Sequence, residues 1–171
     1  LGDVYKRQVF TPSWICNAQN NLVDEQWFGR SNVFNISQDN TWTATERIIF
    51  PEDKQRTWKH YVDARRIEVS CGEAPYLVSR YDTVTGDSIE LLSRIGLLDR
   101  KLRVVTENVS NESEWLKWAY RAYESVYGFE FQGDNLLLAR ENLLYTFIDY
   151  MRYALKRTPT LNELKKVATI I

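Results

Sequence analysis

Two short runs of strand-forming residues, each followed by a turn and a helical pattern, constrain the fold of this chain most strongly. They are RIEVS at residues 66–70 and YGFEF at residues 127–131. A helical pattern begins near Pro75 after the first run, and a long one spans residues 135–155 after the second. Successive strand–turn–helix units favour parallel pairing, so we expect an α/β domain in which the two runs are neighbouring parallel strands. The long helix should pack on that sheet.

The interval between the two predicted strands is too long for a simple crossover. It carries helical patterns at residues 95–105 and 112–126, which predict a helical insertion between the first two core strands. The other patterns predict a first helix, short extended pieces within residues 33–50, a short helix after Thr57, and a last helix behind a capping box. The first helix starts at Thr11-Pro12, runs to about Asp24 and has an apolar face of Trp14, Ile15, Ala18 and Leu22; the capping box is Thr160 to Glu163.

Composition excludes several classes of protein. The chain has 171 residues and a formal net charge of −1, which disfavours tight electrostatic binding of DNA by this piece alone. No apolar run approaches the length of a membrane-spanning helix. His60 is the single histidine, and Cys16 and Cys71 lie far apart, so the sequence predicts no metal site. The two thiols are typical of a cytoplasmic protein, although one long-range disulfide remains an alternative.

Neither end of the chain has the pattern of a natural terminus. Met151 is the only methionine, and residues 1–8 (LGDVYKRQ) show neither core periodicity nor a signal peptide, so we interpret them as a non-native leader. Residues 161–171 form an amphipathic pattern that is still apolar where the sequence stops. We therefore expect residues 9–171 to be a single domain, truncated at its C-terminus.

The segment RIEVSCGEAPYL, residues 66–77, carries the most chemical information. A strand that ends in a Cys-Gly turn and opens a helix can bring backbone N–H groups and a helix dipole toward a nucleoside-containing cofactor. From the spacing alone, a strand–helix turn without any ligand is an equal alternative, because only Gly72 supplies the small backbone that such a site needs.

This segment resembles the first cofactor motif of adenine-specific DNA methyltransferases, an acidic-Pro-Ala-Cys-Gly-x-Gly-x-Phe-Leu pattern. The matching positions are Glu68, Ser70, Cys71, Gly72, Tyr76 and Leu77. Upstream, residues 9–12 (VFTP) resemble the Phe-Thr-Pro element of restriction–modification methyltransferase subunits. Downstream, residues 126–130 (VYGFE) and the helix after them resemble the second motif. The three landmarks stand in the family's order over roughly residues 9–150.

The resemblance implies a partial Rossmann-like methyltransferase fold that binds S-adenosylmethionine, acts on DNA and associates with restriction or specificity subunits. It implies a cofactor site in which an acidic residue of the second motif holds the ribose hydroxyls. The residues that this assigns to the site are Phe10, Thr11, Pro12, Glu68, Cys71, Gly72, Glu130 and Asp134. For Glu130 a solvent-facing strand-end acid is an alternative of equal weight, and for Asp134 a helix N-cap is the favoured alternative.

The departures from the family pattern support a second hypothesis, a non-catalytic binding or assembly module. Ala74 replaces the second glycine and should obstruct close approach to a cofactor, Glu73 adds an acid, and Pro75 removes an N–H donor. The family's Asn/Asp-Pro-Pro-aromatic loop, which holds the extruded base, has no counterpart, because no two prolines are adjacent. If the enzyme hypothesis holds, that loop lies beyond Ile171.

Four basic residues lie close together in the sequence. Arg94, Arg100, Lys101 and Arg103 fall within and just before a predicted helix. Such a cluster is either a track for nucleic-acid phosphates or, more commonly, a solvated helix face. We expect the solvated face.

Overall fold

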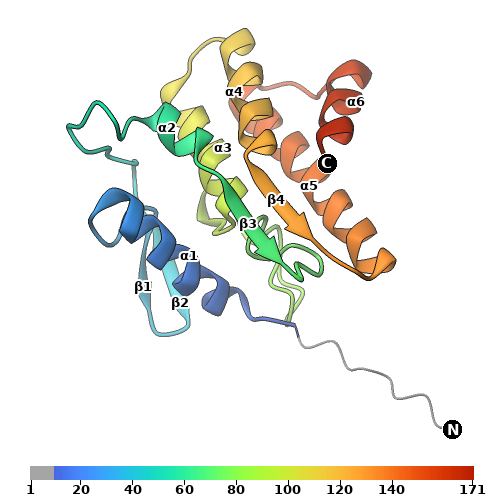
Figure 1. Cartoon of the computed structure of the whole chain (residues 1–171), viewed down its shortest axis with the longest axis horizontal. Helices are drawn as coiled ribbons and strands as arrows, with labels where there is room; N and C mark the ends of the chain where they lie inside the picture. Colours follow the sequence, from blue (N-terminus) through green and yellow to red (C-terminus); the bar gives the residue numbers. More distant parts are fainter. Residues whose placement is uncertain (1–9) are drawn as a thin grey trace, which may run out of the picture.

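The computed structural model describes residues 10–171, and the predicted leader at residues 1–8 lies outside them. Two small sheets and a set of helices make up this part of the chain (Figure 1). In chain order the elements are α1 (Ser13–Phe28), β1 (Asn35–Gln38), β2 (Thr41–Ala44), α2 (Trp58–Asp63), β3 (Arg66–Val69), the 3-10 helix η1 (Leu91–Ser93), α3 (Leu97–Asn108), α4 (Glu112–Glu124), β4 (Val126–Phe129), α5 (Gly133–Leu155) and α6 (Leu161–Ile170).

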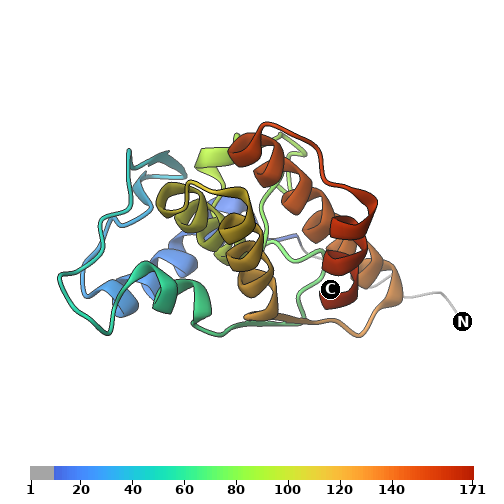
Figure 2. The same ribbon diagram turned by 90° about the horizontal axis from the view of Figure 1, so that it is seen from above.

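The two predicted core strands pair as expected. β3 and β4 are parallel neighbours whose register runs from Arg66 opposite Val126 to Val69 opposite Phe129. The predicted helical insertion is also present, because η1, α3 and α4 lie between the two strands in the chain. Figure 2 shows β3 and β4 along one margin of the molecule, with α3, α4 and α5 all on the same side of them.

Lys101 of α3 ties the starts of the two parallel strands together. Its buried ammonium donates to the carbonyl of Ala64, directly after α2, and to the hydroxyl and carbonyl of Ser125, directly after α4. A cation at the C-terminal ends of two helices is favourable, because both ends present unpaired carbonyls. β3 begins at Arg66, shortly after Ala64, and β4 begins at Val126, directly after Ser125. The Lys101 side chain therefore fixes where both strands start.

The predicted extended pieces within residues 33–50 are only partly present. β1 and β2 form an antiparallel hairpin, with Asn35 opposite Ala44. Residues 47–50 (RIIF), the last of the expected extended pieces, do not pair as a strand. Ile48 is buried and its N–H donates to Glu107 of α3, while Phe50 packs against the rings of Phe28 and Tyr61. Contacts with other segments therefore replace strand pairing there.

The buried face of α1 is polar, not the apolar face that the sequence suggests. Asn17, Asn20 and Asp24 are buried, whereas Trp14 is 39% exposed and Leu22 is 61% exposed. The polar side chains face inward because their partners are there. Asn20 donates to the carbonyls of Tyr76 and Ile95, and the other two bind a buried arginine. The helix also extends past Asp24 to Phe28.

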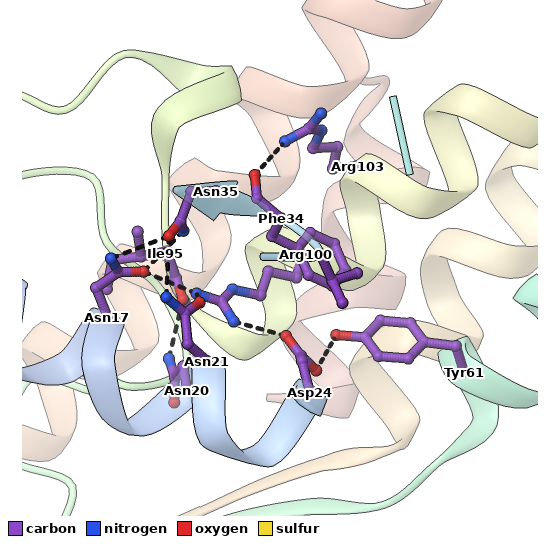
Figure 3. Close-up of polar contacts among 12 residues, drawn as sticks. Asn17, Asn20, Asn21, Asp24, Phe34, Asn35, Tyr61, Ile95, Arg100 and Arg103 are labelled. Carbon is purple, nitrogen blue, oxygen red and sulfur yellow. Dashed lines mark hydrogen bonds and ion pairs between the residues drawn. The ribbon is translucent and has the colours of Figure 1, made fainter. Parts of the chain in front are cut away.

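The basic cluster is buried, so its interpretation as a solvated face was wrong. Arg100, Lys101 and Arg103 are at most 4% exposed, and the Arg94 side chain is 8% exposed. The Arg100 guanidinium donates to Asp24 at 2.6 Å and to the amide oxygens of Asn17 and Asn21, and Tyr61 donates to the second oxygen of Asp24 (Figure 3). Arg94, Arg100 and Arg103 pair with carboxylates inside the protein. Burial lowers the pKa of Lys101 to about 7, and its amine is bonded to Ala64 and Ser125, so none of the four groups is available to a phosphate.

At the C-terminal end, α5 and α6 form as predicted. The capping box is present, because Thr160 accepts from the Glu163 N–H while the Glu163 carboxylate accepts from the Thr160 N–H. Within residues 10–171, every helix is too short or too polar to cross a membrane.

Candidate functional site

A cavity of 280 Å³ opens where β3 and β4 end. It brings together Phe10, Thr11, Glu68, Cys71, Gly72 and Glu130, which come from three segments far apart in the sequence. We expected Glu68, Gly72 and Glu130 to line one concavity at the carboxyl ends of the strands, closed from the side by Thr11 and Pro12. All of these residues except Pro12 line the cavity.

Two of the predicted site residues do not line the cavity. Pro12 is the N-cap of α1, and the backbone N–H of the next residue, Ser13, donates to Asp82 at 2.8 Å. Asp134 lies in the first turn of α5 and not at the N-cap, which is Gln132, so the favoured alternative for Asp134 was also wrong. A carboxylate in a first turn still stabilises the helix through its dipole.

The predicted helix after Pro75 does not form. The Ala74 carbonyl accepts from the N–H groups of Leu77 and Val78, and the chain then leaves the turn. The carbonyls of Tyr76 and Leu77 accept from the first two N–H groups of α3, at 2.8 Å each, so they are not free to form intrahelical bonds. The site therefore lacks the helix N-terminus that our interpretation of residues 66–77 required.

The turn after β3 adopts an unusual backbone. Ser70, Gly72 and Ala74 all have left-handed conformations, with φ of 56°, 55° and 66°. Such φ values favour glycine, and only one of the three positions has it. Backbone hydrogen bonds hold this turn in place. The Cys71 N–H donates to the Phe129 carbonyl at 2.9 Å, and further bonds lie within the turn.

Glu130, which directly follows β4, binds the backbone of this turn. One carboxylate oxygen accepts from the Gly72 N–H at 2.7 Å, and the other accepts from the N–H groups of Phe131 and Gln132 at 2.9 Å each. These backbone donors, Gln132 first and Gly72 next, lower the pKa of Glu130. The residue thus joins the ends of β3 and β4, and its carboxylate is ionised at neutral pH.

Glu68 lies on the side of β3 that faces the helices, and it lines the cavity. Burial raises the pKa of its carboxyl to about 8. Its oxygen Oε2 is buried and has no hydrogen-bond partner among the described residues. In the ionised form of Glu68 this atom is a buried acceptor without a donor, and a donor from a ligand would lower the cost of burying it.

The two thiols and the phenol around Glu68 stay neutral over the physiological range. Burial raises the pKa of Cys16 to about 12, of Cys71 to about 11 and of Tyr76 to about 12. None of them supplies a positive charge to compensate the Glu68 carboxylate. Glu68 is therefore the group in this part of the cavity whose charge changes near neutral pH.

Glu73 lines the cavity, but its carboxylate is bonded within the protein. Its carboxylate accepts from the Tyr81 hydroxyl, and Asn142 of α5 donates both to that hydroxyl at 3.0 Å and to the Glu73 carbonyl at 3.3 Å. Tyr81 and Asn142 give Glu73 a structural function that the sequence analysis did not foresee. The signal for it was absent, because the three residues are distant in the chain.

The cavity wall also includes residues that sequence reasoning missed. Thr83 donates its hydroxyl to the Thr11 carbonyl at 2.8 Å and so anchors the N-terminal segment to the loop before η1. The remaining unpredicted lining residues are Ser70, Glu73, Pro75, Tyr76, Gln132 and Asn135. The wall contains three carboxylates and no lysine, arginine or histidine. Such a lining can bind ammonium, sulfonium or hydroxyl groups and repels phosphates.

Ala74 does not obstruct this cavity, contrary to our expectation. It lines a different, apolar cavity of 220 Å³ between β4, α5 and α6, together with Leu77 and Leu143. Its side chain is 1% exposed. The missing glycine of the motif therefore affects the packing beneath the turn and not the space for a ligand.

We expect Ala74→Gly to leave ligand affinity unchanged within about twofold. Relief of the left-handed strain, about 1 kcal/mol, is offset by the greater backbone freedom of glycine and the lost methyl contacts, so the free energy of unfolding should change by less than about 1 kcal/mol. Calorimetric titration with S-adenosylmethionine and chemical denaturation of both proteins measure the two effects. A gain of tenfold or more in affinity would show that Ala74 does restrict the cavity.

Comparisons with family models, with curated proteins and with solved structures found no match to this chain.

Proposed function

We propose that this chain is the cofactor-binding part of an S-adenosylmethionine-dependent DNA adenine methyltransferase of a restriction–modification system. One observation carries the proposal: an acidic cavity without cationic side chains lies at the carboxyl ends of two parallel strands, lined by Glu68, Gly72 and Glu130. In open α/β sheets, ligands bind outside the carboxyl ends of the strands. In support, each of the three segments that resemble the family's motifs contributes residues to the wall of this cavity.

The lining fits the positive and hydroxylated parts of S-adenosylmethionine. Glu68 would receive the ammonium group, because its Oε2 is buried and lacks a donor. Glu130 would receive ribose hydroxyls on the lone pairs that its backbone donors leave free. The bound cofactor supplies an activated methyl group, which in this reaction class is transferred to the amino group of adenine. Cofactors that carry phosphates are disfavoured by the ionised Glu130 and by the lack of cationic side chains in the described lining.

A second candidate function is a non-catalytic module that retains the fold for binding or assembly. The fit for the cofactor's carboxylate is poor, because the Gly72 N–H is already bonded to Glu130, Pro75 has no N–H, and no helix starts at the turn. In this alternative, Glu130 serves only to lock the turn. The two functions differ in whether the cavity binds the cofactor at all.

Calorimetric titration of the protein with S-adenosylmethionine tests the proposal, and ATP is the phosphate-bearing control. We expect saturable heat with S-adenosylmethionine and none with ATP. Absence of heat with millimolar S-adenosylmethionine would reject the cofactor site and leave the module. Equal binding of both compounds would reject the electrostatic argument, because an acidic wall should discriminate against a triphosphate.

The affinity for S-adenosylmethionine should rise with pH. A cationic ligand group binds the ionised form of Glu68, which is the minor form below a pKa of about 8. The ionised fraction increases about tenfold per pH unit in that range, so affinity should rise by up to about tenfold between about pH 6 and pH 7. Titrations at several pH values measure this dependence.

Glu68→Gln provides the matched control for that prediction. The amide is nearly isosteric with the carboxyl but does not titrate, so the variant should bind weakly with a flat profile over the same range. An identical slope in the variant and the original protein would assign the pH dependence to another group and remove Glu68 from the site.

A further inference from the structure

The turn after β3 binds a carboxylate that belongs to the protein itself. The Gly72 N–H donates at 2.7 Å to Oε2 of Glu130, which lies 58 residues later in the chain. Both residues line the acidic cavity. A side chain therefore fills the position that an anionic group of a ligand would take at this backbone donor.

The backbone of this turn is of a kind that binds anions. Ser70, Gly72 and Ala74 have positive φ, whereas the two residues between them do not. Alternation of left- and right-handed conformations brings neighbouring N–H groups to one side of the chain and forms a concave anion site called a nest. The residue at the centre of this alternation is Gly72, and its N–H is the group that binds Glu130.

Glu130 can release Gly72 and keep its other hydrogen bonds. Its second oxygen, Oε1, accepts from the N–H groups of Phe131 and Gln132, which are its own neighbours in the chain. We call the N–H groups of Gly72, Phe131 and Gln132 the three donors. Of their bonds to Glu130, only the one from Gly72 joins the ends of the two strands. Breaking it frees one donor, the Gly72 N–H, and one acceptor, Oε2, in the wall of the same cavity.

We propose that this turn is a carboxylate site, that Glu130 occupies it as an internal substitute, and that the carboxylate of a zwitterionic ligand displaces Glu130 from Gly72. Oε2 of Glu130 then accepts from a hydroxyl or ammonium group of the same ligand. One N–H···O bond is exchanged for another of the same kind, and Oε2 gains a new donor. The proposal rests on the proposed function for the identity of the ligand, since S-adenosylmethionine carries all of these groups.

The charges of the cavity restrict the ligand to one that carries both signs. A second carboxylate beside the ionised Glu130 is repelled unless a cation accompanies it. Glu68 offers an acceptor for that cation, because its Oε2 is buried and has no hydrogen-bond partner among the described residues. A simple anion should therefore fail to displace Glu130, whereas a ligand with an amino-acid head group succeeds.

Amide NMR spectra of the complete 171-residue chain test the carboxylate site with acetate as the probe. In Glu130→Ala the site loses its internal occupant, so acetate should shift the resonances of the three donors saturably. In the original protein the shifts should be less than about a tenth as large, because a tethered carboxylate outcompetes a free one. Sodium chloride at equal ionic strength measures the effect of salt alone.

Glu141→Ala is the matched control. Glu141 is an exposed residue of α5 that does not line the acidic cavity, so its loss changes the net charge equally and should leave the three donors insensitive to acetate. Glu130→Gln retains the shape of the side chain if Glu130→Ala does not fold, and it should respond to acetate because a neutral amide is a weaker competitor. Insensitivity of both Glu130 variants to acetate would overturn the proposal, as would equal shifts in the original protein.

S-adenosylmethionine and its decarboxylated analogue distinguish this proposal from the proposed function. The ratio of their affinities measures the contribution of the ligand's carboxylate, and it should be at least about fivefold larger in Glu130→Gln than in the original protein. An equal ratio in the two proteins would overturn the exchange at Gly72. If neither compound binds but acetate still shifts the three donors in Glu130→Ala, the cofactor assignment is rejected and the carboxylate site remains.

Discussion

Arg100→Met should lower the free energy of unfolding by about 3–5 kcal/mol, the range expected when one member of a buried ion pair is removed. The guanidinium and its partner are both buried, with Asp24 1% exposed and the Arg100–Asp24 contact at 2.6 Å. Methionine fills a similar length but donates no hydrogen bond. Asp24 would keep only the Tyr61 hydroxyl, and the amide oxygens of Asn17 and Asn21 would lose their shared donor.

Chemical denaturation measures this loss, and two further variants identify its cause. Arg121→Met removes a surface pair with Asp63, whose side chains are 41% and 54% exposed, and should cost less than about 1 kcal/mol. Adding Asp24→Asn to Arg100→Met should restore part of the stability, because the double variant no longer buries an unpaired charge. A loss below about 1 kcal/mol for Arg100→Met would contradict the view that this pair organises α1.

Gly96→Ala should destabilise the protein by about 3 kcal/mol, through a steric clash. Gly96 is the N-cap of α3 with an ordinary φ of −62°, so its backbone conformation is open to any residue. An added Cβ would collide with the Leu77 carbonyl and lie 2.6 Å from the Asp99 carboxylate. The Leu77 backbone cannot move away without breaking the bonds that it and Tyr76 accept from α3.

Gly133→Ala is the control for this prediction. A Cβ at Gly133 meets nothing within 4 Å, and the residue begins α5. Alanine favours a helix over glycine by up to about 1 kcal/mol, so this variant should be neutral or slightly more stable. Thermal denaturation of both variants gives the comparison. Similar melting temperatures for the two would show that the loop of residues 75–79 can move away from α3.

The parts of the fold that were predictable from the sequence depend on local patterns. The pairing of β3 with β4 followed from two strand–turn signals, and the capping box at Thr160 located the start of α6. The convergence of Glu68, Gly72 and Glu130 was an implication of the resemblance to methyltransferase motifs, and it agrees with the parallel pairing, because parallel strands end at the same edge. The strand pairing and the capping box needed only neighbouring residues and the handedness of strand connections.

The failures have a common physical origin. The polar face of α1 is buried because Arg100 lies against it, and Arg100 is 76 residues away from Asp24 in the chain. No periodicity in α1 reports a partner at that distance, so the apolar residues Trp14 and Leu22 were the more reasonable choice for the core. The helix expected after Pro75 failed for the same reason, since its carbonyls are bonded to the start of α3.

The position of Lys101 has a consequence for the order in which the chain folds. Pairing β3 with β4 requires closure of a long loop, which is an entropic cost that makes parallel sheets slow to form. Lys101 divides this closure into two shorter ones, because it lies 37 residues after Ala64 and 24 residues before Ser125. Docking of α2 and α4 on α3 would bring both strand starts to this one side chain, so we expect the parallel pair to form after these helices. φ-value analysis of Lys101 and of the β3 side chains would measure that order.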